Sequence, residues 1–451
     1  MTIKKSEEGS FRDPSGRVYY QNGQVLREVN YIYQANYKKL MKSGLFRELT
    51  QLGMLIKHVE IKNDNQVYKT IKPDMIPFIS YSYEWCFSQL QSAALLTLNI
   101  EKLCLKYDMN LKDASAFNVQ FIGKKPIFID TLSFEEYTPG KPWVAYRQFC
   151  QHFLAPLALM AYTDNRLNKL ANLFLDGIPL DLADTLLPLS AKINFGILGH
   201  IVLNSKSQYL KSTKSKGKDN YNLTKQGLES IIDSLISLIK NLKPKKRNST
   251  WGEYYSNTNY NQKSFNNKGK LVEDFLKNLP LKSILDLGAN NGYFSEIAAK
   301  TKAYVISADY DEKSIEDNFL QDSSSNILPL VIDFMNPSAS LGWANQERKS
   351  FWERANVDLI MMLATIHHLA ISNNLPFEKI ASLVKDKCSY LIIEFVPKSD
   401  SKVKILLSQR EDIFDLYTEE NFEKVFKKYF KIIKKENISG SQRYLYLMEK
   451  K

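Results

Sequence analysis

Buried strands and helical stretches alternate along the second half of the chain. Five apolar runs rich in β-branched residues occupy 283–288, 303–309, 328–334, 357–363 and 390–396. Segments with helical character, such as 295–301 and 375–386, separate these runs. Strands that are apolar throughout are typical of a parallel sheet that helices cover on both faces. The pattern predicts a doubly wound α/β domain, with ligands bound beyond the carboxyl ends of its strands.

The first half has a mixed pattern that predicts an α+β domain. Residues 11–29 alternate as a hairpin does, whereas 142–162 and 176–189 are apolar stretches expected to form buried helices. Residues 204–270 are rich in Lys, Ser and Asn, which is typical of a linker, although 228–242 has the spacing of an amphipathic helix. We therefore expect an α+β domain at 1–204, a basic linker with one helix at 205–250 and the α/β domain at 251–451.

Composition and charge narrow the classes of function. The 451 residues carry a net charge of +12, and 205–270 holds 14 Lys and Arg against 4 Asp and Glu, so +10 of this charge lies between residues 205 and 270. A nucleic-acid-binding face is therefore not favoured. The four cysteines lie far apart, which predicts neither a zinc site nor a disulfide framework. No apolar run is long enough to span a membrane, and we expect a soluble cytoplasmic protein.

A glycine-containing turn follows the first strand of the α/β domain. It runs from Asp286 through Gly288, Asn290 and Gly292. A dinucleotide fingerprint would require glycine at positions 288, 290 and 293, and only the first of these is glycine. The run instead resembles the first motif of class I S-adenosylmethionine (SAM)-dependent methyltransferases, with Asn290 in place of the middle glycine. The resemblance implies a Rossmann-like sheet with SAM as cofactor, held by the residues of this turn.

Acidic residues end the following strands in order. Asp309 lies 23 residues after the acid of the glycine turn, close to the spacing at which a carboxylate reaches ribose hydroxyls, and Tyr310 beside it is positioned to stack on adenine. The resemblance implies that Asp333 and Phe334, at the end of the third strand, contact the adenine. Glu394 ends the fifth strand and is a candidate substrate contact. Each acid alone could equally cap a helix, but their joint order favours a cofactor site.

Candidate residues for the chemistry itself lie after the fourth strand. His367 and His368 stand where small-molecule methyltransferases commonly carry a histidine pair, and histidine has a suitable pKa for a general base. The alternative is that the pair forms only a polar rim. Tyr254 and Tyr255, upstream of the sheet, are candidate contacts to the acceptor or to SAM, or they dock the next helix. In the insertion 341–354, we expect side chains that line the acceptor site, with Trp343, Arg348 and Arg354 as candidates.

The first half contains a second resemblance. Asp113, Asn118 five residues later, and Asp130 at the end of a strand have the order of the catalytic segment of protein-kinase-like and aminoglycoside-phosphotransferase-like folds. In those families the first Asp orients the acceptor hydroxyl, while the Asn and the last Asp bind the metal on the phosphates. The resemblance implies a kinase-like domain with Mg-ATP as a second cofactor. Otherwise, residues 113–118 are a capped turn and 127–130 a core strand.

The remaining parts of a kinase site are less complete. Lys69 or Lys72 is a candidate for the phosphate-binding lysine, and Glu84 for its partner on a helix. No glycine-rich loop precedes them, and Leu111 and Lys112 stand where protein kinases have His and Arg. The sequence thus favours a kinase-like fold more strongly than phosphoryl transfer.

Together these patterns predict a methyltransferase with a kinase-like domain that presents the acceptor or binds a nucleotide. Methyl transfer is an in-line displacement that needs no metal, and a small-molecule acceptor is the default because the motifs of amino-group and cytosine methylases are missing. Three alternatives remain: a bifunctional phosphotransferase-methyltransferase, a nucleic-acid or protein methyltransferase, and a non-catalytic SAM-binding scaffold.

Overall fold

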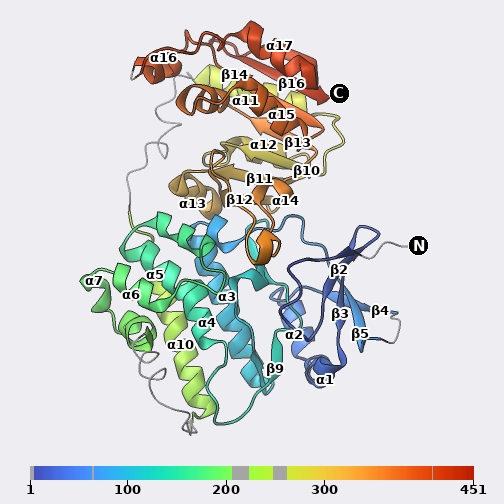
Figure 1. Cartoon of the computed structure of the whole chain (residues 1–451), viewed down its shortest axis with the longest axis vertical. Helices are drawn as coiled ribbons and strands as arrows, with labels where there is room; N and C mark the ends of the chain where they lie inside the picture. Colours follow the sequence, from blue (N-terminus) through green and yellow to red (C-terminus); the bar gives the residue numbers. More distant parts are fainter. Residues whose placement is uncertain (1–4, 63–65, 206–222, 247–261, 323, 409) are drawn as a thin grey trace. The chain divides into compact units, whose positions relative to one another are not determined.

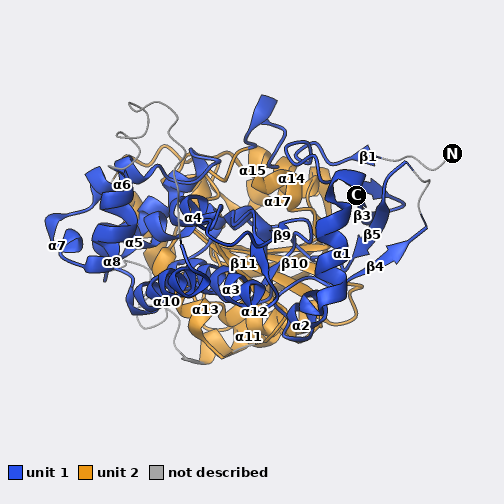
Figure 2. Cartoon of the chain, turned by 90° about the horizontal axis from the view of Figure 1, so that it is seen from below, with its two compact units in different colours: residues 1–246, 340–349 blue, residues 247–339, 350–451 orange. Residues whose placement is uncertain are grey.

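Two compact units make up the part of the chain that the computed structural model describes, namely residues 5–62, 66–205, 223–246, 262–322, 324–408 and 410–451 (Figure 2). Unit 1 comprises 1–246 and 340–349, and unit 2 comprises 247–339 and 350–451. Unit 1 is therefore discontinuous, because a short segment that interrupts the second half of the chain belongs to it.

Unit 1 begins with a five-stranded antiparallel sheet in the order β1-β2-β3-β5-β4. The hairpin expected within 11–29 is formed by β2 and β3, which are joined by Asn22 and Gly23 with φ of 53° and 74°. Two left-handed residues are what the tightest hairpin turn requires. The elements of this half are β1 (Lys5–Ser6), β2 (Val18–Gln21), β3 (Gln24–Val29), α1 (Gln34–Ser43), α2 (Leu45–Gln51), β4 (His58–Ile61) and β5 (Lys69–Pro73).

The helical half of unit 1 is built around α3 (Phe87–Lys106), whose residues are buried on most faces. The helix α10 (Lys225–Asn241) packs along α3 (Figure 1), and Gln91 Nε2 of α3 donates to Ile239 O at 2.7 Å. The amphipathic helix expected in the linker thus belongs to unit 1, because its apolar face is covered by α3. The other helices are α4 (Tyr146–Phe149), α5 (Ala155–Tyr162), α6 (Leu180–Leu186), α7 (Leu189–Lys192) and α8 (Phe195–Ile197).

Two small antiparallel sheets carry the kinase-like segment of unit 1. They pair β6 (Met109–Leu111) with β9 (Phe134–Glu136), and β7 (Val119–Ile122) with β8 (Lys125–Phe128). The loops that connect these strands contain the residues of the second resemblance. Unit 1 therefore has the expected α+β organisation.

Unit 2 contains a seven-stranded sheet in the order β12-β11-β10-β13-β14-β16-β15. Its first five strands are parallel and have the reversal of strand order at β10 that defines a doubly wound fold, whereas β16 runs antiparallel between β14 and β15. This sheet confirms the Rossmann-like fold expected from the sequence. The strands are β10 (Ser283–Leu287), β11 (Tyr304–Asp309), β12 (Ile327–Val331), β13 (Leu359–Met362), β14 (Tyr390–Phe395), β15 (Phe430–Asn437) and β16 (Tyr444–Lys450).

Helices cover both faces of this sheet, as the buried strands require. One core cluster joins α11 and α12 to the sheet through residues such as Val272, Phe275 and Phe294, all of which are buried. The helices are α11 (Gln262–Leu276), α12 (Tyr293–Ala299), α13 (Glu312–Leu320), α14 (Phe351–Arg354), α15 (Phe377–Lys385), α16 (Ser401–Ser408) and α17 (Glu419–Tyr429). Of the helices described in the two units, none combines the length and apolar character that crossing a membrane requires.

Candidate functional site

A cavity of about 430 Å³ lies at the carboxyl edge of the unit 2 sheet. This volume is within the range of roughly 300–1,000 Å³ that is typical of small-molecule sites. Its wall is formed by residues that follow β10, β11, β12 and β13 and by side chains of α11, α12 and α16. Seven of the residues predicted to bind the cofactor line it: Asp286, Gly288, Asn290, Asp309, Tyr310, Asp333 and Phe334.

The glycine turn is held in a conformation that explains its composition. Gly288, Asn290 and Gly292 have φ of 81°, 51° and 86°, values that residues other than Gly, Asn and Asp rarely adopt. A Cβ on Gly288 would lie 2.7 Å from Thr365 Oγ1, and a Cβ on Gly292 would lie 2.5 Å from Asn318 Nδ2. Gly292, which was also predicted to bind the cofactor, is not among the lining residues of the cavity. It is the N-cap of α12, and its left-handed backbone lets the helix begin there.

Asp309 is the carboxylate that the turn organises. Its Oδ2 accepts a hydrogen bond from Asn290 N at 2.9 Å, and its Oδ1 accepts one from Asp311 N at 3.0 Å. Each oxygen keeps a second lone pair for a ligand hydroxyl. Burial raises the pKa of Asp309 to about 6, although the backbone N–H donors act in the opposite direction. The carboxylate of Asp309 is therefore oriented to accept hydrogen bonds, and its charged form is destabilised by burial when no ligand donates to it.

Asp286 occupies the neighbouring strand end and is 1% exposed. Ser295 Oγ donates to its Oδ2 at 2.7 Å, and the same hydroxyl lies 2.8 Å from Ser307 Oγ. Burial raises the pKa of Asp286 to about 7, against the hydrogen bond from Ser295 and the nearby Lys268 cation, which both lower it. A cationic ligand group would hold this carboxyl in its ionised form.

The residues that follow β11 and β12 form a more open side of the cavity. Tyr310, directly after β11, is 50% exposed. Asp333 Oδ1 accepts from Met335 N at 2.9 Å, which closes a tight turn around Phe334. Asp333, Phe334 and Met335 all line the cavity, so both aromatic and polar contacts are available there.

The two histidines are placed differently. His368 lines the cavity, whereas His367 is 2% exposed and its Nδ1 has no hydrogen-bond partner among the described residues. Their ring centroids are 4.1 Å apart. Burial lowers the pKa of His368 to about 4 and that of His367 further below its usual value. His368 is therefore neutral at physiological pH and able to accept a proton in the cavity.

A buried lysine is part of the site and was not predicted. Lys268 of α11 lines the cavity, and its Nζ lies 2.6 Å from Glu394 Oε2. Glu394 is fully buried and also pairs with Arg443 at 3.1 Å, which in turn pairs with Asp400 at 2.8 Å. Burial lowers the pKa of Lys268, while Glu394 opposes this shift. Glu394 thus serves the site through Lys268 and does not itself line the cavity.

The sequence does contain a signal for Lys268. On α11, Phe265, Lys268, Val272 and Phe275 follow the three-to-four-residue spacing of one helix face. A single charged residue on an otherwise apolar face is expected either to be paired or to serve a site. The tyrosines predicted as substrate contacts, Tyr254 and Tyr255, lie outside the described residues.

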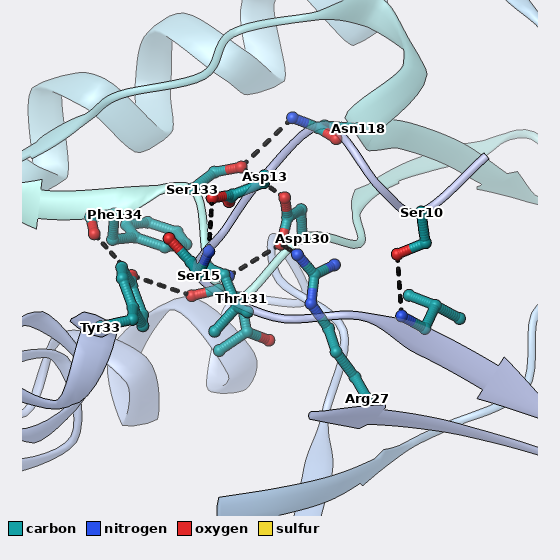
Figure 3. A network of polar contacts seen from close by, with 12 residues as sticks. Ser10, Asp13, Ser15, Arg27, Tyr33, Asn118, Asp130, Thr131, Ser133 and Phe134 are labelled. Carbon is teal, nitrogen blue, oxygen red and sulfur yellow. Dashed lines mark hydrogen bonds and ion pairs between the residues drawn. The ribbon is translucent and has the colours of Figure 1, made fainter. Parts of the chain in front are cut away.

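In unit 1, Asp130 is the centre of a polar cluster (Figure 3). Its Oδ1 accepts from Leu132 N at 2.8 Å and lies 2.9 Å from Arg27 Nη2, while its Oδ2 accepts from Ser133 Oγ at 2.8 Å. Asn118 Nδ2 donates to the same Ser133 hydroxyl at 3.2 Å. The structure therefore brings Asn118 and Asp130 together, as the kinase-like resemblance implies.

The other predicted acid, Asp113, and the β1–β2 loop complete this cluster. Asp113 Oδ1 accepts from Ser115 N at 2.9 Å and from Gln148 Nε2 at 2.8 Å, and burial raises its pKa. Lys112 Nζ lies 3.2 Å from Asp13 Oδ2 and donates to Ser15 Oγ at 2.8 Å. The β1–β2 loop is thus bonded to the segment that precedes Asp113.

The cation paired with Asp130 is Arg27, which was not among the predicted site residues. Lys69, a candidate for the phosphate-binding lysine, lies on β5 and pairs with Glu60 at 2.5 Å. Glu84, expected to pair with that lysine, is buried in its own short turn and accepts from Tyr81 N at 3.0 Å. Arg27 lies on β3, whose pairing with β5 sets Arg27 opposite Ile71. The pair with Asp130 joins this strand to the loop after β8, and no local sequence pattern indicates it.

The insertion expected to line the acceptor site also differs from its prediction. Its residues 340–349 belong to unit 1, where Arg348 lies 4.2 Å from the ring centroid of Phe117. Of its candidate residues, only Arg354 belongs to unit 2, where its Nε donates to Ser350 O at 3.2 Å. None of these residues lines the cavity described above.

The chain was compared with protein-family models and with solved structures. No family model matches it. Among solved structures, the bifunctional kinase-methyltransferase WbdD matches 47% of this chain and 45% of its own at 16% identity and a TM-score of 0.28. The N-methyltransferase NodS of Bradyrhizobium japonicum WM9 matches 42% of this chain and 98% of its own at 11% identity and a TM-score of 0.31.

A curated protein is similar along nearly the whole sequence. The nodulation protein NoeA of Rhizobium meliloti (strain 1021) is 33% identical over 458 residues, which cover 98% of this chain and 95% of that protein. The similarity thus includes both units and the segment that joins them. Identity at this level over nearly the whole length of both proteins shows that the chain belongs to the same family as the nodulation protein NoeA.

Proposed function

We propose that unit 2 binds SAM and transfers its methyl group to a small-molecule acceptor. One observation carries the proposal: the residues that the methyltransferase resemblance assigns to the cofactor, from three successive strand ends, line a single cavity. Isolated acids at strand ends would cap helices without converging on one space. The acceptor is proposed as a small molecule because the motifs of amino-group and cytosine methylases are missing, and because only +2 of the net charge of +12 lies outside 205–270.

The cavity offers a suitable partner for each part of SAM. Asp309 would accept hydrogen bonds from the ribose hydroxyls, and Tyr310 and Phe334 would hold the adenine between aromatic faces. The strand order places the remaining amino-acid end toward β10. There Asp286 and Lys268 supply an anion and a cation for its ammonium and carboxylate groups.

The chemistry needs an in-line approach and the removal of one proton. When bound, SAM supplies an electrophilic methyl group on a sulfonium, whose sulfur keeps the bonding electrons when the methyl group leaves. His368, which lines the cavity and has a neutral ring at physiological pH, would accept the proton of an acceptor hydroxyl or amine. His367, buried behind it, would hold the ring of His368 in place.

Calorimetry of the full chain with S-adenosylhomocysteine (SAH) tests the proposal. Wild type should bind, and Asp309→Ala should lose roughly ten- to a hundredfold in affinity, since each hydrogen bond to a charged group contributes about 1.5–3 kcal/mol. The exposed Asp386, which ends α15, provides the matched control Asp386→Ala. If wild type fails to bind SAH, the proposal is wrong. If wild type binds SAH, a comparison of metabolites from cells with and without the gene would identify the methylated acceptor.

Phosphoryl transfer by unit 1 is the second candidate function, as the resemblance of Asp113, Asn118 and Asp130 implies. It would require Asp130 to exchange Arg27 for the metal ion bound to the phosphates. A thermal shift with Mg-ATP that Asp130→Ala abolishes would support it, and an unchanged unfolding temperature of wild type would remove it.

A further inference from the structure

Residues 340–349 form a small hairpin that is closed by its own hydrogen bonds. Leu341 N donates to Arg348 O at 2.9 Å, Arg348 N donates to Leu341 O at 3.2 Å, and a short turn over Trp343–Asn345 lies between them. A Cβ on Gly342 would lie 2.5 Å from Glu347 Cβ, so the hairpin is compact. Although its neighbours in sequence belong to unit 2, it is part of unit 1 (Figure 2).

Glu347 fixes one side of this hairpin to the β1–β2 loop of unit 1. Its carboxylate is 2% exposed and accepts two hydrogen bonds from the Arg12 guanidinium, both at 2.7 Å. The same carboxylate accepts from Trp343 N at 2.7 Å. The hydrogen bond from Arg12 is the main cause that lowers the pKa of Glu347. A bidentate pair with one buried partner is among the strongest side-chain contacts and defines a single geometry.

The loop and the hairpin also fit closely at their backbones. A Cβ on Gly9 would lie 2.4 Å from Glu347 O, so only glycine permits this approach. Lys349 Nζ lies 3.2 Å from Glu7 Oε2 on the same loop. These contacts place the hairpin directly on residues 7–12.

The other side of the hairpin contacts the second half of unit 1. The hydroxyl of Tyr81 accepts from Lys349 N at 3.2 Å, and the Arg348 guanidinium lies 4.2 Å from the centre of the Phe117 ring. Leu341 packs against a buried cluster that contains Tyr81 and Ala171. The hairpin is therefore held by the β1–β2 loop and by the helical half at once.

Both sets of contacts adjoin the polar cluster around Asp130. Arg12 precedes Asp13, which pairs with Lys112, and Phe117 precedes Asn118, which donates to Ser133. A displaced hairpin would free the loop that Asp13 anchors.

We propose that unit 1 serves as an intramolecular receptor for the 340–349 hairpin, with the Arg12–Glu347 pair as the latch. Docking then couples the kinase-like unit to methyl transfer through the chain itself, because Asp333, Phe334 and Met335 of the cofactor cavity stand a few residues before the hairpin. This coupling rests on the proposed function of unit 2, whereas the docking rests on contacts within unit 1 alone.

Hydrogen exchange of the full chain tests the docking, because a change in either partner should loosen the segment that contains the other. Arg12→Glu should speed amide exchange in 340–349 by about tenfold or more, since it leaves the buried charge of Glu347 unpaired. Glu347→Gln should speed exchange in 7–17 by about tenfold or more, since it removes the charge from the bidentate pair that holds this loop. The pair of Lys39 and Glu136, also within unit 1, provides the control Lys39→Glu. Effects confined to each variant's own segment, or unchanged exchange, would overturn the proposal.

Affinity for SAH tests the coupling. Both variants should weaken binding by a similar factor of a few, and the double variant should be no weaker than either single one, because each removes the same interaction. Unchanged affinity together with faster exchange would overturn the coupling. If wild type does not bind SAH at all, the function proposed for unit 2 fails, and the exchange experiment still decides the docking.

Discussion

The backbone N–H of Asn290 donates to Asp309 Oδ2 at 2.9 Å and so joins the glycine turn to the acid at the next strand end. The left-handed φ of 51° at Asn290 is needed to aim this N–H group. The position that departs from the expected glycine therefore keeps the backbone conformation that glycine would give. This contact makes the turn and the acid one structural element, from which the first predictions follow.

Asp309 should make SAH binding depend on pH. With a pKa raised to about 6 by burial, the carboxyl becomes protonated as the pH falls below this value and loses part of its capacity to accept hydrogen bonds. We expect SAH affinity to fall between about pH 7 and pH 5, with a flatter profile for Asp309→Asn. Calorimetry across this range measures both. Parallel profiles for the two proteins would show that Asp309 does not cause the dependence.

The same pKa predicts an opposite effect on stability without ligand. Because the folded pKa of Asp309 lies above the unfolded value, the contribution of this group to stability decreases as the pH rises through about 6. The unfolding temperature of Asp309→Asn minus that of wild type should therefore increase as the pH rises from about 5 to about 8. Differential scanning calorimetry without SAH measures this difference, and a constant difference contradicts it.

Lys268 should select for the amino-acid end of the ligand. Lys268→Met keeps the apolar stem and removes the cation, so SAH affinity should fall by roughly tenfold or more. Affinity for 5′-methylthioadenosine, which lacks the amino-acid group, should hardly change. Tyr310→Ala, on the opposite side of the cavity, should weaken both ligands. Equal losses for the two ligands in Lys268→Met would show that the lysine only supports the fold.

Gly288 should not tolerate a side chain. Gly288→Ala combines a φ of 81° with a Cβ placed 2.7 Å from Thr365 Oγ1. We expect a loss of about 1–3 kcal/mol in the stability of unit 2 together with weaker SAH binding, because strain at such positions costs this much. Gly199→Ala, where a Cβ has open space, is the control. Thermal unfolding and calorimetry decide the outcome.

Arg27 should matter more to unit 1 than Lys69. Arg27→Met leaves the Asp130 carboxylate without its cation in a largely buried position and should destabilise unit 1 by about 2–4 kcal/mol. Lys69→Met breaks a partly exposed pair with Glu60 and should hardly change the stability of unit 1. Hydrogen exchange within 109–136 reports the stability of this unit separately from unit 2. Similar effects of the two variants would contradict the assignment of Arg27.

Sequence reasoning identified the carboxyl-edge residues of unit 2 for a physical reason. In a parallel sheet, strand ends that are far apart in sequence meet at one edge, so Asp286, Asp309 and Asp333 could be placed together without knowledge of any side-chain contact. The five parallel strands were recognisable because they are apolar on both faces. Local pattern and topology were sufficient for this part of the site.

Long-range pairing accounts for what the sequence did not reveal. Lys268 meets Glu394 only through the packing of α11 on the sheet, and Arg27 of β3 meets Asp130 only where the loop after β8 approaches that strand. Glu347 and Arg12 lie 335 positions apart, and neither has a local pattern that indicates its partner. Such contacts depend on tertiary structure, and periodicity along the chain contains no information about them.

The discontinuity of unit 1 has a consequence for its biosynthesis. When the ribosome has released residues 1–246, the surface formed by Arg12, Tyr81 and Phe117 is still without the hairpin that covers it. Domains generally fold in order of synthesis, yet unit 1 gains its last part only after β10, β11 and β12 have been made. A nascent chain therefore completes its first unit during the assembly of its second, and cutting the gene after residue 246 would yield two incomplete products.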